Sequence, residues 1–319
     1  MIAQLTELGH DFKGTPALQW MREHTEVPIL AVVFYLAFVL FVPNTIMAHR
    51  PPIKMRLWNI LWNLVRTVFA VGGTYYCVPQ LMEWCTASLI PNLLPRHLRD
   101  PQPIVEGSFY TSMCYWNKGM FLDGTAAMWL LLINLLNLSE LINTVFLVFQ
   151  KKPVNFLHWY YHATVLLFCW HAYVTQTSSG LWFAALNYSV HSILYLYDFL
   201  FACGLGKVIR PIAPVISALK ILQVLAGTFI VVYTAVQRAV HPNGCDTANS
   251  SILIGLLIYG SYLLLFFRFF LLRLSPHRIF LKSRKSKRRK PLVLQSMVGV
   301  VDGENLFEMD AKHGLRKYV

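Results

Sequence analysis

The fold is decided by the stretch that reads, from residue 124 to residue 173, GTAAMWLLLINLLNLSELINTVFLVFQKKPVNFLHWYYHATVLLFCWHAY. Two almost wholly apolar blocks, 124–148 and 154–173, flank a short loop that carries Lys151 and Lys152. A helix needs about 20 apolar residues to cross a bilayer, so each block is long enough to be a membrane span. The stretch therefore predicts two transmembrane helices joined by a tight basic loop.

Apolar blocks of the same kind recur along the rest of the chain. The sequence is 56% hydrophobic and only 13% charged over 319 residues, whereas soluble domains carry about a quarter charged residues. We therefore predict an all-α integral membrane protein with seven transmembrane helices. The seven blocks are residues 28–47, 58–79, 124–148, 154–173, 181–203, 212–236 and 251–273.

Positive charge gathers on alternate connections between these blocks, and most of all in the run 283–290 near the C-terminus. The positive-inside rule places these connections in the cytosol. We expect a luminal N-terminal segment (1–27), a transmembrane domain (28–275) and a basic cytosolic tail (276–319). The basic connections hold Arg50, Lys54 and Arg56, then Lys151 and Lys152, then Lys207 and Arg210.

The net charge of +13 follows from this topology and from contact with anionic lipid headgroups, so the expected partner is the lipid bilayer and not a nucleic acid. The last four residues, 316–319, resemble a dilysine-type retrieval signal with Arg in place of one Lys. We therefore expect a multi-pass protein of the endoplasmic reticulum membrane with its C-terminus in the cytosol.

Two of the six cysteines, Cys114 and Cys245, fall in connections assigned to the oxidising lumen. A disulfide between them and a pair of free thiols are both open from the sequence. Cys169 and Cys203 lie within predicted spans, where cysteine behaves as a small apolar residue.

Polar side chains interrupt four consecutive predicted spans. An ionisable group at the centre of a span costs about 2.5–3.5 kcal/mol on insertion scales, so it usually faces a cavity or a partner. A rise of about 1.5 Å per residue brings the groups to comparable depths, which predicts one buried polar chamber open toward the cytosol. The groups are Asn137, Glu140 and Asn143; His158, Tyr161 and His162; Asn187, His191 and Asp198; and Lys220 and Gln223.

The chamber allows three interpretations. Its side chains could be hydrogen-bonding glue between helices. They could hold a metal, but only His158, His162 and His191 lie at a suitable depth, so we expect no metal site. They could perform metal-free acid–base or covalent chemistry on a lipid-linked substrate, which suits the cluster best.

Four motifs resemble those of the fatty-acid elongase family, in the family order and spacing, over residues 28–275. One resembles the histidine box, one the segment before it, and the others the motifs of the next two spans. They are FLHWYYHATV (156–165), ELINTVF (140–146), NYSVH (187–191, followed by Tyr195 and Tyr197) and KILQ (220–223).

The resemblance implies a barrel-like bundle of seven helices around a narrow acyl tunnel, closed toward the lumen and entered by CoA from the cytosol. The implied reaction is the decarboxylating Claisen condensation of malonyl-CoA with acyl-CoA to a 3-oxoacyl-CoA two carbons longer. It needs no cofactor. The ketoacyl-CoA reductase, dehydratase and enoyl reductase of the elongation cycle would be further partners.

The resemblance also assigns roles to the matching residues. The implied catalytic residues are His158, Tyr161, His162 and His191. The implied substrate-binding residues are Glu140, Asn143, Asn187, Tyr195, Lys220 and Gln223. Lys151, Lys152, Lys207 and Arg210 are candidates to bind the CoA phosphates, although the positive-inside rule alone explains each of them equally well.

Four positions depart from the family pattern: Tyr161 replaces a histidine nucleophile, Asn137 and Asn143 replace Lys and Asp, and Lys220 replaces Gln. A phenol ionises only near pH 10 and could form only a phenolic ester. Either His191 carries the acyl group or acts as base while Tyr161 hydrogen-bonds the thioester carbonyl, or both thioesters react in one ternary complex.

The same departures leave open a non-catalytic relative that binds acyl-CoA or scaffolds the elongation enzymes. Chain length stays undetermined by the sequence, with Trp170, Trp182 and Phe183 as candidate residues for the floor of the tunnel.

Overall fold

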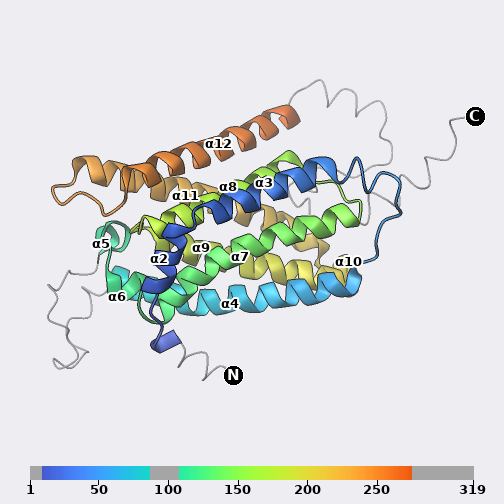
Figure 1. The fold of residues 1–319 in the computed structure, drawn as a ribbon. Helices are drawn as coiled ribbons and strands as arrows, with labels where there is room; N and C mark the ends of the chain where they lie inside the picture. Colours follow the sequence, from blue (N-terminus) through green and yellow to red (C-terminus); the bar gives the residue numbers. More distant parts are fainter. Residues whose placement is uncertain (1–8, 87–107, 275–319) are drawn as a thin grey trace, which may run out of the picture.

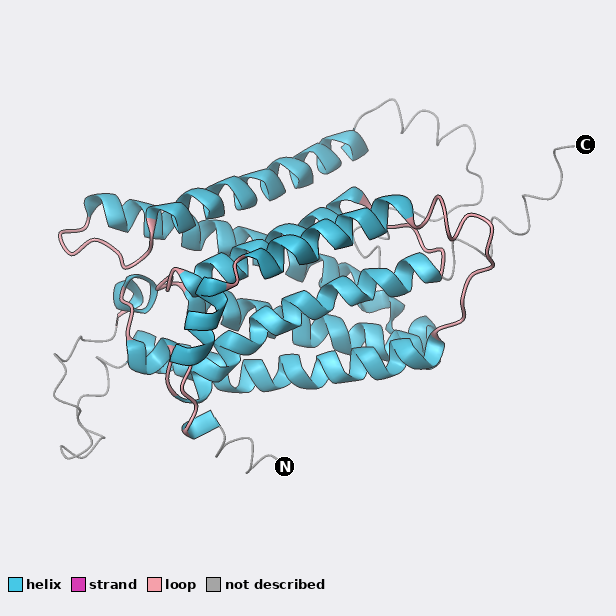
Figure 2. Cartoon of the chain, in the orientation of Figure 1, coloured by secondary structure: helices cyan, strands magenta, loops and turns pink. Residues whose placement is uncertain are grey.

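The computed structural model describes residues 9–86 and 108–274, and this part of the chain is helical, without a regular strand (Figure 2). Its seven longest helices coincide with the seven predicted apolar blocks. The helices are α2 (Thr15–Glu23), α3 (Glu26–Phe41), α4 (Arg56–Thr86), α5 (Phe109–Cys114), α6 (Lys118–Phe121), α7 (Gly124–Phe149), α8 (Phe156–Val174), α9 (Gly180–Leu200), α10 (Gly206–Ile209), α11 (Ala213–Val240) and α12 (Asn249–Leu274). The predicted tail 276–319 and its retrieval signal lie outside the described residues.

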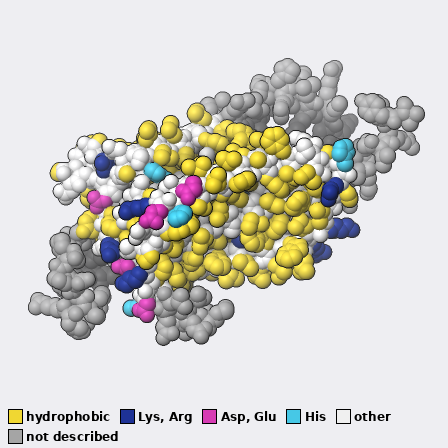
Figure 3. All heavy atoms as spheres, viewed as in Figure 1, with side chains coloured by type: hydrophobic (Ala, Val, Ile, Leu, Met, Phe, Trp, Pro, Cys, Tyr) yellow, Lys and Arg dark blue, Asp and Glu magenta, His cyan; other side chains and the backbone are white. Residues whose placement is uncertain are grey.

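The long helices run side by side along one direction, and short helices and loops gather at the two ends (Figure 1). Hydrophobic side chains cover the middle of the visible surface, while charged side chains gather toward its ends (Figure 3). An apolar belt of this kind is what the hydrocarbon region of a bilayer requires of a helical protein.

Three stretches of the described chain are long and apolar enough to cross a membrane: Gly124–Phe149, Gly180–Val240 and Asn249–Phe266. The pair α2 and α3, bent by 60°, makes a fourth if it is counted as one span. The second stretch contains both α9 and α11, whereas α4 and α8 carry charged residues and histidines that lower their hydropathy. These spans are consistent with a multi-pass membrane protein.

The most extensive contact between two described helices is that of α4 with α9. Gly73 of α4 lies directly against the ring of Tyr188, which is 1% exposed and donates its hydroxyl to the carbonyl of Trp129 over 2.8 Å. A glycine is required here because a Cβ atom at residue 73 would lie 2.4 Å from that ring. The close approach fixes α4, α7 and α9 relative to one another.

The N-terminal segment contains a helix that the sequence prediction for residues 1–27 did not include. Helix α2 buries Leu18 and Met21 against the end of α8, where the indole of Trp170 donates to the carbonyl of Met21 over 3.1 Å. The segment is short and mostly polar, so its two buried apolar residues were too weak a signal. Helix α2 covers the end of the bundle at which α8 ends.

A disulfide joins Cys114 and Cys245 at the same end. The backbone supports it, because Asp246 donates its N–H to the carbonyl of Cys114 over 2.8 Å and accepts from Trp116 N–H over 3.0 Å. The loop 241–248 is thereby fastened to α5, so the connections at this end form one linked layer.

The opposite end carries the basic connections. Arg56 at the start of α4 donates to the carbonyls of Ala202 and Cys203 over 3.2 and 3.1 Å. The turn from α9 toward α11 requires Gly204, whose φ of +99° lies in the left-handed region that favours glycine. Ile53 N–H bonds to the carbonyl of Phe149 over 2.9 Å, so this end is also held by backbone contacts.

Gly73→Ala should lower the melting temperature in detergent, because the added methyl group overlaps Tyr188 and overpacking typically costs 1–3 kcal/mol. Gly260→Ala in α12 is the matched control, since no atom lies within 4 Å of the position of its added Cβ. Equal melting temperatures for the two variants would show that α4 and α9 are not in close contact.

Peptide mapping under non-reducing conditions should recover the peptides of Cys114 and Cys245 as one cross-linked species that separates on reduction. Cys77, Cys85 and Cys169 provide internal controls, because the structure holds each of them as a free thiol. Recovery of both Cys114 and Cys245 as alkylated free thiols from unreduced protein would contradict the disulfide.

Candidate active site

An elongated cavity of about 260 Å³ follows α8 inside the bundle. Its lining runs from Asn155, just before the helix, to Tyr173 near its end, which corresponds to about 27 Å at 1.5 Å per residue. Residues of α7, α9, α11 and α12 form most of the remaining wall, to which α4 adds Arg66 and α6 adds Phe121. The cavity therefore extends over nearly the whole length of the helix that carries the predicted histidine box.

The wall changes in character along this length. The end near the loop between α7 and α8 holds the ionisable side chains. The other end is aromatic and aliphatic, with Trp116, Phe121, Leu122, Leu130, Phe168 and Phe183. One end therefore suits a polar reacting group and the other an alkyl chain.

An ion pair between Arg66 and Glu140 is the most buried charged contact of the site, with the two residues 3% and 4% exposed. Arg66 Nη2 donates to both carboxylate oxygens over 2.6 Å, and its Nε donates to Oε1 over 3.2 Å. Arg66 Nη1 also donates to Asn63 Oδ1 over 3.1 Å. Because both charges are hydrogen-bonded, the pair is of the kind that a low-dielectric interior tolerates.

The ion pair continues into a hydrogen-bonded chain on α9. The hydroxyl of Tyr195 donates to Glu140 Oε1, and the Arg66 guanidinium lies 3.8 Å above the Tyr195 ring. His191 Nδ1 lies 2.5 Å from the same hydroxyl. Since the phenolic proton is directed to Glu140, Nδ1 of His191 must be the donor, which leaves Nε2 with a free lone pair. The hydrogen bonds from His191 to Tyr195 and from Tyr195 to Glu140 thus fix the tautomer of His191.

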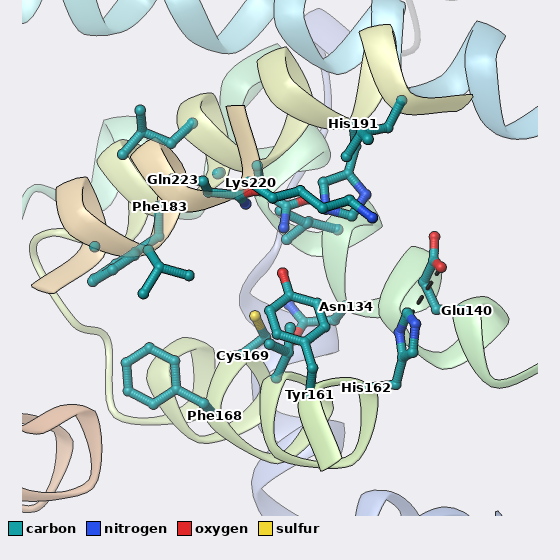
Figure 4. Close-up of a pocket in the computed structure, with 18 of the residues that line it drawn as sticks. Asn134, Glu140, Tyr161, His162, Phe168, Cys169, Phe183, His191, Lys220 and Gln223 are labelled. Atoms are coloured by element: carbon teal, nitrogen blue, oxygen red, sulfur yellow. Dashed lines mark ion pairs between the residues drawn. The ribbon is translucent and has the colours of Figure 1, made fainter. Parts of the chain in front are cut away.

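The histidines of α8 lie on the other side of the carboxylate. His162 Nδ1 is 3.9 Å from Glu140 Oε2 (Figure 4), and the His158 and His162 rings are 4.5 Å apart. His158 Nε2 is 3.0 Å from Thr144 Oγ1, which is in turn 3.0 Å from the hydroxyl of Tyr35. Glu140 is therefore shared between the histidine box and the motif of α9.

Tyr161 points into the cavity from α8, opposite the side chains of His191, Lys220 and Gln223 (Figure 4). Its ring contacts Tyr262 of α12, at 5.5 Å between centroids. No described residue forms a hydrogen bond to its hydroxyl, so the hydroxyl is open to a bound substrate.

All ten residues that the sequence assigned to catalysis or substrate binding line this cavity, from His158 on α8 to Gln223 on α11. The four cations assigned to CoA do not line it. Lys151 and Lys152 lie in the loop next to its polar end, and Lys207 and Arg210 follow α9. The roles of these fourteen residues stay predictions.

Other predictions need correction. Of the candidate floor residues only Phe183 lines the cavity, because Trp170 packs on α2 and the Trp182 indole donates to Ser112 Oγ over 3.1 Å.

Arg66 was missed, although a lone charge inside the apolar block 58–79 was a signal that could have revealed it. Thr144 gave no such signal. Within the described residues, no three His, Cys, Asp or Glu side chains are grouped as metal ligands.

Comparison with known proteins identifies the family of this chain. Residues 20–278 match the sequence model of the ELO family, described as the GNS1/SUR4 family. The chain is 54% identical over 267 residues to fatty acid elongase 3 of Trypanosoma cruzi, covering 82% of this chain and 88% of that protein. It is 45% identical to fatty acid elongase 3 of Trypanosoma brucei brucei, with the same coverage.

A third relative is the very long chain fatty acid elongase 4 of Trypanosoma cruzi, with 41% identity over 83% of this chain and 86% of that protein. The match to the family model extends from α2 past the end of α12 and so includes every wall of the cavity. The chain therefore belongs to the ELO family of fatty acid elongases.

Proposed function

We propose that this chain is the condensing enzyme of fatty-acid elongation, a 3-oxoacyl-CoA synthase. The observation that carries the proposal is the cavity, about 27 Å long, which joins a histidine and carboxylate cluster at one end to an aromatic and aliphatic channel at the other. An acyl chain would lie in the apolar part with its thioester among the histidines. We infer that the apolar part is the acyl tunnel.

The reaction forms one carbon–carbon bond and breaks one carbon–carbon bond and one carbon–sulfur bond. C2 of the malonyl group attacks the acyl carbonyl carbon, and the bond between C2 and the malonyl carboxylate breaks to release CO₂. The acyl carbon–sulfur bond also breaks, and the departing CoA thiolate takes up a proton. The products are the 3-oxoacyl-CoA, CO₂ and free CoA.

His191 is the group best prepared to act on the acyl carbonyl or on the departing thiolate. Its Nδ1–H is held by Tyr195, so Nε2 is available as nucleophile or base. Tyr161, with its hydroxyl free, is placed to donate a hydrogen bond to the thioester oxygen. The two routes, through an acyl-His191 intermediate or a ternary complex, differ in whether Nε2 forms a covalent bond.

We further infer seven membrane spans: α3, α4, α7, α8, α9, α11 and α12. The basic connections, with Lys151, Lys152, Lys207 and Arg210, would face the cytosol beside the polar end of the cavity and attract the CoA phosphates. The layer with the disulfide would face the lumen of the endoplasmic reticulum. The reductases and dehydratase that process 3-oxoacyl-CoA are the expected partners.

Membranes containing the protein should convert labelled malonyl-CoA and an acyl-CoA primer into a 3-oxoacyl-CoA two carbons longer. His158→Ala should abolish the product, since removing one group of a catalytic cluster typically costs 10²–10⁴-fold. Tyr161→Phe retains the ring and deletes only the hydroxyl, so a smaller loss would measure the hydrogen bond to the carbonyl.

A series of primers from short to very long would give the length that the tunnel accepts, and intact-mass measurement of a quenched reaction would detect an acyl adduct on His191. Absence of product for every primer, with CoA thioesters still bound by folded protein, would contradict the enzyme and favour a non-catalytic binding role.

Arg66→Met should lower both the melting temperature and the activity. Removing one partner of a buried ion pair typically costs about 3–5 kcal/mol, because the other charge stays buried. The double variant Arg66→Met/Glu140→Gln removes both charges and should regain most of the melting temperature. It should stay inactive, because Tyr195 and His191 then lack their anion. Wild-type activity in either variant would show that the pair does not orient His191.

A further inference from the structure

Two cations, Arg66 and Lys220, lie in the wall of the cavity. Arg66 is neutralised by Glu140 at 2.6 Å. Lys220, on α11, forms no ion pair or hydrogen bond with any described residue. The cavity therefore holds one cation that no described residue pairs by direct contact.

The other described ionisable groups that face the cavity do not make direct contact with the Lys220 ammonium. His158 and His162 on α8 and His191 on α9 are histidines, and neutral imidazoles do not pair with a cation. Asp198 on α9 and Glu140 on α7 also line the cavity and attract Lys220 electrostatically, but neither carboxylate lies within the 4.0 Å of an ion pair with its ammonium. A carboxylate that enters from outside would find Lys220 available.

A buried ammonium without a partner is costly, and such residues inside membrane proteins mark the path or site of a substrate. Lysine presents its charge on a flexible stem and binds a carboxylate as a compact point charge. In Figure 4 the side chain of Lys220 lies on the same side of the cavity as His191, opposite Tyr161 and His162. The ammonium is thus among the groups of the polar end and away from the aromatic channel.

The two substrates of the proposed reaction differ in one charged group. Both are CoA thioesters, but only the malonyl thioester has a free carboxylate, whereas the primer has an alkyl chain that the apolar channel accommodates. We propose that Lys220 binds the malonyl carboxylate and so directs the malonyl group, and not a second acyl group, to the polar end. This inference rests on the proposed condensing function.

Lys220 is in this role a positioning residue for the carboxylate that leaves as CO₂. When the carbon–carbon bond to C2 breaks, the carboxylate loses its charge and its attraction to the ammonium, so CO₂ is released and Lys220 becomes free for the next malonyl group. No further reactant is needed.

The test compares binding of malonyl-CoA with binding of acetyl-CoA, which lacks the carboxylate, to purified full-length protein. Three variants are used: Lys220→Met, which removes the charge, Lys220→Arg, which keeps it, and, as a matched control, Lys118→Met at an exposed position of α6. Wild-type protein and Lys118→Met should bind malonyl-CoA more tightly than acetyl-CoA. Lys220→Met should bind malonyl-CoA about 10- to 100-fold more weakly than wild-type protein does, which is the effect expected from the loss of one hydrogen bond to a charged group. Its affinity for acetyl-CoA should not change.

Kinetics provide a second readout. Lys220→Met should raise the KM for malonyl-CoA while the KM for acyl-CoA stays unchanged, and Lys220→Arg should recover much of the loss. If Lys220→Met weakened the binding of malonyl-CoA and acetyl-CoA equally, or left the affinity for malonyl-CoA unchanged, the proposed role of Lys220 would be overturned. Failure of the wild-type protein to bind any CoA thioester would instead overturn the proposed function itself.

Discussion

The site depends on one ion pair, between Arg66 of α4 and Glu140 of α7. Both groups are almost fully removed from solvent, so each charge is tolerated only because the other is present. The pair also fixes two helices that come from distant parts of the sequence. Arg66 further holds the ring of Tyr195 on α9. A third helix is therefore set by the same two charges.

The ion pair affects the chemistry of the site through the hydrogen bonds that Glu140 accepts. Glu140 accepts from Tyr195, and Tyr195 therefore accepts from His191, so the Glu140 carboxylate decides which imidazole nitrogen of His191 is free. The same carboxylate lies 3.9 Å from His162 of the histidine box. Glu140 thus links the histidine box of α8 and the motif of α9 in one site.

Much of this arrangement could be predicted from the sequence, because membrane helices have an obvious signal in their length and apolar composition. The seven blocks match the seven longest helices, and depth along them was enough to place His158, His191 and Lys220 in one cavity. What failed was the detection of weak signals. Helix α2 has only two buried apolar side chains, and Arg66 was a single charge among apolar residues.

The contrast between Arg66 and Lys220 shows how the same cavity can use buried charge in two ways. A guanidinium with several fixed donors can be satisfied completely by one carboxylate and one amide, so Arg66 serves structure and orientation. The ammonium of Lys220 contacts no described carboxylate directly, and in our proposal the malonyl carboxylate supplies that contact. An elongase must distinguish a carboxylate-bearing thioester from an alkyl one. A permanently paired cation could not make that distinction, whereas an unpaired one at the polar end can.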